Sequence, residues 1–204
     1  MGGDGSGISS TSGNLSVTAA PGTGVSYGIL MNDATNISAS GDLTITANAG
    51  PGDSTGLQLN TAAGIAANGN ITINATPGSG ASCGVQMTGT SSIAAVTTGN
   101  VAITAYAGSG ASYGLQMNTS AGISALGGNI TVSADAGPGG NIGLEMNNST
   151  AITASNVGAA RTISITTDRL GIACGWRSSG HGCWSPHNRR WRADHWGRTH
   201  FWHL

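Results

Sequence analysis

The stretch Gly69-Asn70-Ile71-Thr72-Ile73 decides the fold, because versions of it recur along most of the chain. Counted from the first apolar residue of each copy, Leu15 to Ile163, the successive spacings are 28, 28, 30, 29 and 33 residues. Two further motifs, Gly-Leu-x-Met-Asn and Ile-x-Ala, recur with the same period. The copies start near residues 13, 41, 69, 99, 128 and 161. A fixed period shared by three motifs indicates a repeat architecture in which each unit stacks on the next.

Each unit contains three short segments in which apolar and polar residues alternate, separated by Gly, Pro, Ser and Asn. This pattern predicts three strands joined by turns. Such short strands bury their apolar side chains only if each pairs with its copy in the next unit. A closed sandwich or barrel is the rival interpretation, but it does not require so strict a period. We therefore predict an all-β fold, a parallel β-helix (solenoid) of about six coils with three short strands per coil.

The repeats align residues into columns, one residue per coil, and the apolar columns are predicted to fill the interior. These columns are Leu15/Leu43/Ile71/Val101/Ile130, Val17/Ile45/Ile73/Ile103/Val132, Met31/Leu59/Met87/Met117/Met146, Ile37/Ile65/Ile93/Ile123/Ile152 and Ala19/Ala47/Ala75/Ala105/Ala134. A polar column, Asn14/Asp42/Asn70/Asn100/Asn129, is expected to hydrogen-bond from coil to coil, as stacked Asn side chains do in cross-β arrays. A glycine column, Gly28/Gly56/Gly84/Gly114/Gly143, predicts a bend with positive φ or a close backbone approach.

The composition changes at residue 173, which divides the chain into a repeat region, residues 1–173, and a tail, residues 174–204. The repeat region has seven acids and two Arg, whereas the tail has five Arg, one Asp and all of the Trp and His residues. We interpret this basic tail, rich in Trp, Arg and His, as disordered or as a frame-shifted sequence. Two functional alternatives are a segment for nucleic acid or anionic membrane and a metal site. The metal site would use Cys174, Cys183, His181 and His187, but it lacks the paired Cys spacing of zinc sites.

The repeat region offers little for catalysis, because its acids are scattered and no His precedes residue 174. We therefore predict no enzyme and no catalytic, cofactor-binding or metal residues. The acids interpreted as solvated turn residues are Asp33, Asp42, Asp53, Asp135, Glu145 and Asp168. The N-terminus shows no signal peptide, and no apolar run approaches the roughly 20 residues that span a membrane.

One surface feature is regular. The first strand of each coil points Ser16/Thr18, Thr44/Thr46, Thr72/Asn74, Ala102/Thr104, Thr131/Ser133 and Ser164/Thr166 outward. Such a hydroxyl grid, about 7 by 4.8 Å, suggests ice or glycan binding. The alternative is that Thr simply fits an exposed strand face, and Ala102 and Asn74 interrupt the grid.

Over residues 7–173 the motifs quoted above resemble the β-helix repeats of filamentous haemagglutinin-like and autotransporter passenger adhesins of Gram-negative bacteria. The resemblance implies a structural or adhesive rod, secreted or displayed at the outer membrane as part of a longer parent protein. The implied partner is a receptor or glycan on a host or neighbouring cell, with no nucleic acid. Uncapped coils predict end-to-end self-association. Loops with Pro and Gly, such as Ala49-Gly50-Pro51-Gly52-Asp53, are the expected contact points.

Overall fold

The computed structural model describes residues 5–110, 113–138, 142–155, 160–168, 170–173 and 191–192. All regular elements in these residues are strands, and they form three sheets. Sheet A contains β1 (Gly7–Ser10), β4 (Asn36–Ala39), β7 (Gly64–Ala67), β10 (Ser92–Ala95), β13 (Gly122–Ala125) and β16 (Ala151–Ala154). Sheet B contains β2 (Leu15–Ala19), β5 (Leu43–Asn48), β8 (Ile71–Thr76), β11 (Val101–Tyr106), β14 (Ile130–Asp135), β17 (Ile163–Thr167) and β19 (Trp191–Arg192). Sheet C contains β3 (Ile29–Met31), β6 (Leu57–Leu59), β9 (Val85–Met87), β12 (Tyr113–Met117), β15 (Ile142–Asn147) and β18 (Leu170–Ala173).

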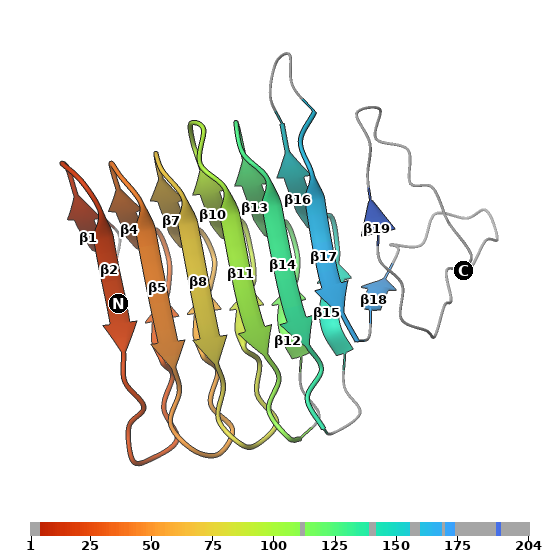
Figure 1. The fold of residues 1–204 in the computed structure, drawn as a ribbon. Coiled ribbons are helices and arrows are strands. Elements are labelled where there is room, and N and C mark those ends of the chain that lie inside the picture. Colours follow the sequence, from red (N-terminus) through yellow and green to blue (C-terminus); the bar gives the residue numbers. More distant parts are fainter. Residues whose placement is uncertain are drawn as a thin grey trace.

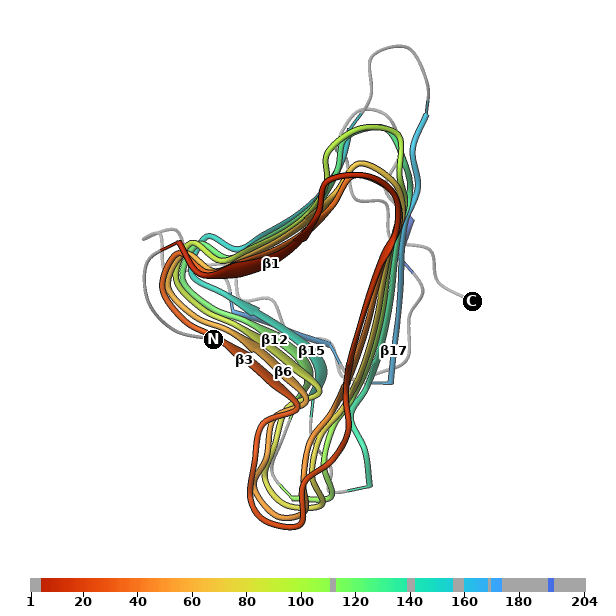
Figure 2. The ribbon, with the colours of Figure 1, turned by 90° about the vertical axis from the view of Figure 1, so that its left-hand side faces the viewer.

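From β1 to β18 the chain visits the three sheets in turn, so every third strand lies in the same sheet and pairs with its predecessor in parallel. Figure 1 shows the strands of sheet B side by side, and Figure 2, along the axis, shows the coils superimposed around one bore. With strands about 4.8 Å apart, the five steps from β1 to β16 make a rod about 24 Å long. The predicted parallel β-solenoid with three strands per coil is confirmed.

The interior columns are also confirmed, residue for residue. Leu43 pairs with Ile71 and Ile71 with Val101, while Ile37 pairs with Ile65. Side chains in the middle coils are fully buried, since Ile45, Ile73 and Leu59 have no exposed surface. Alternate residues of each strand face the bore because successive side chains of a strand point to opposite faces. Identical or similar apolar side chains therefore stack along the axis and form one continuous core.

The glycine column lies where the chain returns from a long loop to sheet C. A Cβ at Gly84 would collide with the backbone oxygen of Tyr106, and one at Gly56 would lie 2.7 Å from the backbone oxygen of Gly84. Close backbone approach therefore explains why this column contains only glycine. Positive φ is not, because the described glycines with positive φ are Gly5, Gly13, Gly52, Gly89 and Gly137.

The loops that connect sheet B to sheet C form a lobe beside the bore (Figure 2). Their backbones hydrogen-bond from coil to coil: Gly78 N donates to Ser54 O at 2.7 Å, and Gly80 N donates to Gly52 O at 2.9 Å. The loop that contains Pro51, expected to be a contact point, thus stacks on the next coil as regularly as the strands do. The described loops form an ordered wall of the rod.

The sixth coil closes differently. Its first motif, near residue 161, forms β17 in register with β14, so that Ile163 pairs with Ile130. Only residues 168–169 separate β17 from β18, so this coil has no lobe, yet Leu170 still pairs with Leu144. The tail strand β19 pairs antiparallel with β17, and its Arg192 lies opposite Ser164. The remainder of the tail, including Cys174, His181, Cys183 and His187, lies outside the described residues, so its interpretations stay predictions.

Candidate functional site

The outer face of sheet B presents two columns of short polar side chains in register. The β-pairing aligns Thr44 with Thr72 and Thr72 with Ala102 in one column, and Thr46 with Asn74 in the other. The alternation of each strand places these residues outward, because their neighbours, such as Ile71 and Ile73, fill the bore. The hydroxyl grid predicted from the sequence is therefore present, with its interruptions at Ala102 and Asn74.

A ladder of hydrogen bonds borders this face where each coil enters sheet B. The backbone N of Asp42 donates to Asn14 Oδ1 at 2.8 Å, and that of Asn70 donates to Asp42 Oδ1 at 2.7 Å. The ladder continues from Asn100 to Asn70 at 2.9 Å and from Asn129 to Asn100 at 2.8 Å. The predicted coil-to-coil hydrogen bonding is confirmed. It continues beyond the predicted column, because Thr162 N donates to Asn129 Oδ1 at 2.9 Å.

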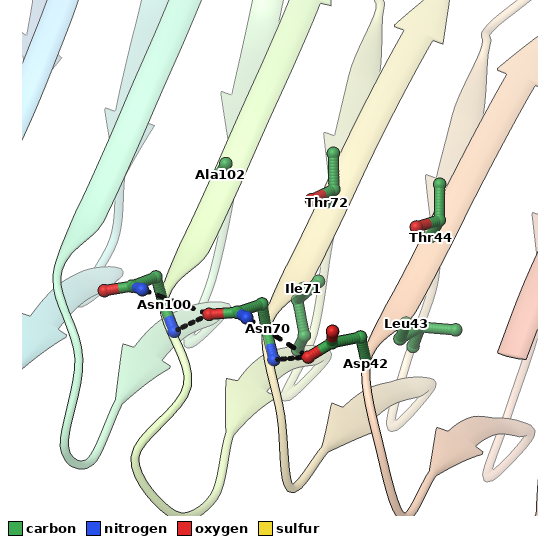
Figure 3. Close-up of a pocket in the computed structure, with 8 residues that line it drawn as sticks. All are labelled: Asp42, Leu43, Thr44, Asn70, Ile71, Thr72, Asn100 and Ala102. Atoms are coloured by element: carbon green, nitrogen blue, oxygen red, sulfur yellow. Dashed lines mark hydrogen bonds between the residues drawn. The ribbon is translucent and has the colours of Figure 1, made fainter. Parts of the chain in front are cut away.

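The side-chain amides add a second set of bonds to this ladder. Asn70 Nδ2 donates to Asp42 Oδ1 at 3.1 Å, and Asn100 Nδ2 donates to Asn70 Oδ1 at 3.0 Å. Asp42 therefore accepts two hydrogen bonds through one carboxylate oxygen. Its other oxygen takes no part in the ladder and points away from Asn70 (Figure 3).

An open depression of about 390 Å³ lies between this ladder and the hydroxyl grid. It crosses the strands β5, β8 and β11, and Figure 3 shows the ladder along one side with Thr44 and Thr72 on neighbouring strands along the other. The residues that line it are Asp42, Leu43, Thr44, Asn70, Ile71, Thr72, Asn100 and Ala102. Ala102, which interrupts the hydroxyl grid, lines this depression in the same column as Thr72.

The outer face of sheet C carries a second network that sequence reasoning missed. Gln86 Nε2 donates to Gln116 Oε1 at 2.8 Å, and Gln116 Nε2 donates to Glu145 Oε2 at 2.7 Å. In the neighbouring column, Asn60 Nδ2 donates to Asn32 Oδ1 at 2.8 Å. The recurring sequence Gln-Met-Asn, with Gln-Leu-Asn and Gln-Met-Thr as variants, was the available signal. These amides bind one another from coil to coil, so this face stabilises the stack.

A thiol lies beside that network. Cys83 Sγ is 3.9 Å from Gln116 Oε1, and the residue is 7% exposed. The pKa of Cys83 is raised to about 11, mainly by burial. A hydrogen bond with the Tyr113 backbone lowers the pKa, whereas the negative charge of Glu145 raises it. Burial and the same charge also raise the pKa of the Tyr113 hydroxyl. Because the thiolate is the reactive form, Cys83 is a poor nucleophile at neutral pH.

Most of the acids have structural roles in the rod. Asp53 Oδ1 accepts from Ala81 N at 2.7 Å, and Asp168 Oδ1 accepts from Ala136 N at 2.8 Å. Asp135 lies at the end of β14 and accepts from Gly137 N at 2.8 Å. Asp33 adopts a positive φ of 56°, which suits a turn. Within the described ranges, no three His, Cys, Asp or Glu side chains gather into a group that could hold a metal ion.

The described residues contain no helix that could span a membrane. No family model, curated protein or solved structure matches this chain. The fold defines its class, a parallel β-solenoid.

Proposed function

We propose that this chain is a structural and adhesive rod segment of a secreted or surface-displayed bacterial adhesin, and that it performs no catalysis. The observation that carries the proposal is the in-register pairing of all three sheets along one axis. Backbone hydrogen bonds, apolar columns and two polar ladders all run in that direction. Such a rod holds its surface residues at fixed spacings and transmits load along its length.

The partner in this proposal is a receptor or glycan on a host or neighbouring cell. Self-association along the axis is a second contact. Ile8 in β1 is 39% exposed, whereas its partner Ile37 is fully buried. A further coil stacked on β1, from the same polypeptide or a second copy, would cover this apolar side chain.

Adhesion is tested with beads coated with the full chain and applied to epithelial cell layers under flow. We expect these beads to be retained, and we expect excess soluble chain to displace them. Antibodies against the folded chain should also bind intact cells of the bacterium that makes it. Retention no greater than that of albumin-coated beads would contradict the adhesive role. Antibody binding only after cell lysis would contradict surface display.

Ice binding is a second candidate, and the flat hydroxyl grid of sheet B favours it. Its two outward columns repeat about every 4.8 Å along the axis and are about 7 Å apart across the strand. Thermal hysteresis that is lost in Thr46→Lys and kept in a lobe variant such as Ser79→Ala would support this candidate. Absence of hysteresis at high protein concentration would remove it.

A further inference from the structure

We propose that the depression over β5, β8 and β11 is a binding site for a neutral saccharide. This inference rests on the adhesive function proposed above, because it identifies the receptor chemistry as a neutral glycan and gives the contact a position on the rod.

The first observation is that two departures from the repeat meet at this depression. Asp42 is the only acid in its ladder, where the neighbouring coils have Asn. Ala102 is the only residue without a hydroxyl in the column that also contains Thr44 and Thr72. A column that serves only stacking has no need of either change. Both changed residues line the same depression, which lies open to solvent.

The second observation is the set of hydrogen-bonding groups that remains available there. The ladder uses one oxygen of Asp42, which leaves the other to accept a hydrogen bond from a ligand hydroxyl. Asn70 gives one amide proton to Asp42, and a primary amide has a second proton to donate. A sugar hydroxyl can donate a hydrogen bond to the Asp42 carboxylate and accept one from the Asn70 amide. The hydroxyls of Thr44 and Thr72 lie beside them (Figure 3).

The ladder also fixes these groups before any ligand arrives. Asn70 is held through its backbone N, its Nδ2 and its Oδ1, the last of which accepts from Asn100. A side chain already held in its bound orientation loses little conformational entropy on binding. The regular stack therefore supplies a rigid support for a weak, repeated contact.

Size and charge select the ligand class. The depression is shallow and open to solvent, so it suits a weak contact with one face of a sugar rather than an enclosed ligand. From β5 to β11 the site extends about 10 Å, which suits a short saccharide lying along the axis. Asp42 is the only charged residue that lines the depression. Its negative charge opposes sulfated, sialylated or phosphorylated glycans and favours neutral ones.

The experiment follows backbone amide NMR signals of the full chain during titration with single sugars. The probes are the methyl glycosides of glucose, galactose, mannose and N-acetylglucosamine, each taken to about 50 mM. N-acetylneuraminic acid serves as the anionic counterpart and calcium chloride as the cation. We expect at least one neutral glycoside to shift signals of Thr44, Asn70 and Thr72, with a Kd of about 1–10 mM. We expect no such shift from the anionic sugar.

Two variants restore the repeat and should still fold. Asp42→Asn installs the residue found in the neighbouring coils, and Ala102→Thr refills the column; each should weaken binding at least tenfold. Asp33→Asn, which removes the same charge from a turn elsewhere, should leave binding unchanged. The saccharide proposal is overturned if no neutral glycoside shifts these signals or if Asp42→Asn binds as well as the natural chain. A shift by calcium alone would assign a cation site and would also overturn it.

The bead assay separates this proposal from the adhesive function. Retained beads combined with no glycoside shift would reject the saccharide site and keep the rod. A glycoside shift with no bead retention would keep the site and reject the adhesive role.

Discussion

Replacing Ser91 by Ala should stabilise the protein. Ser91 lies at the corner between sheets C and A with no exposed surface, and its hydroxyl has no hydrogen-bond partner. The equivalent residues one coil before and one coil after are Ala63 and Ala121, which are also fully buried. The column therefore accommodates a methyl group, and the serine oxygen is an unsatisfied polar atom in an apolar bore.

The expected gain follows from two opposing contributions. An unsatisfied buried hydroxyl costs about 1–3 kcal/mol of folding free energy, which the substitution removes. The oxygen-sized void left behind, about 15 Å³, costs roughly 0.4 kcal/mol at about 24 cal/mol per Å³. The free energy of unfolding should therefore rise by about 1 kcal/mol. For a chain of this size that corresponds to an increase of about 2–4 °C in Tm.

Urea unfolding followed by circular dichroism measures this change as a higher midpoint at unchanged slope. The matched control is Ser82→Ala, because Ser82 is also buried but donates to Gly78 O at 3.0 Å. That control should lose about 1 kcal/mol. If Ser91→Ala lowers the midpoint as Ser82→Ala does, the Ser91 hydroxyl has a partner and the reasoning is refuted.

Four further substitutions are tested by urea or thermal unfolding. Gly84→Ala should lower the free energy of unfolding by more than about 2 kcal/mol, because its Cβ would meet the backbone of Tyr106. The control Gly122→Ala should be neutral or stabilising, because a Cβ there has nothing within 4 Å. Equal effects of the two substitutions would contradict the close approach at Gly84. Ile73→Ala should cost about 2–5 kcal/mol, and a loss below 1 kcal/mol would mean that the bore collapses to fill the cavity. Since burial raises the pKa of Cys83 from 9.0 to about 11, the unfolded thiol ionises first and stability should fall between these pH values. Cys83→Ala should remove that part of the pH dependence, and an unchanged slope would place its origin elsewhere.

The fold could be predicted because the period fixes the register. Once Leu15, Leu43 and Ile71 are aligned, parallel pairing places them in one column, and a shift by one residue would move every apolar side chain to the outside. The Asn ladder followed from the same alignment, since identical amides one coil apart are at hydrogen-bonding distance. Six copies of one pattern supplied information that a single strand does not contain.

The lobe and the depression were not predictable in this way. Ala49-Gly50-Pro51-Gly52-Asp53 reads locally as an irregular loop, and its order arises from backbone hydrogen bonds to neighbouring coils that the local sequence does not specify. Ala102 reads as a defect in a hydroxyl column, because composition alone does not show that the missing side chain leaves space. Its meaning depends on Asp42, two coils away, and only the stacking brings the two to one surface.

A repeat of this kind provides its own standard for each position, so a residue that departs from its column requires a physical reason. Some departures are answered inside the stack: Glu145 accepts a hydrogen bond from Gln116, and Cys83 is buried as a neutral thiol. Asp42 and Ala102 are different, because both line one depression that is open to solvent. Asp42 has a carboxylate oxygen there that the ladder does not use, and Ala102 lacks the hydroxyl of its column. Stacking supplies no reason for either change. A ligand that is held by the rod's surface supplies one, and the two repairing substitutions, each predicted to keep the fold and lose the ligand, separate recognition from stability.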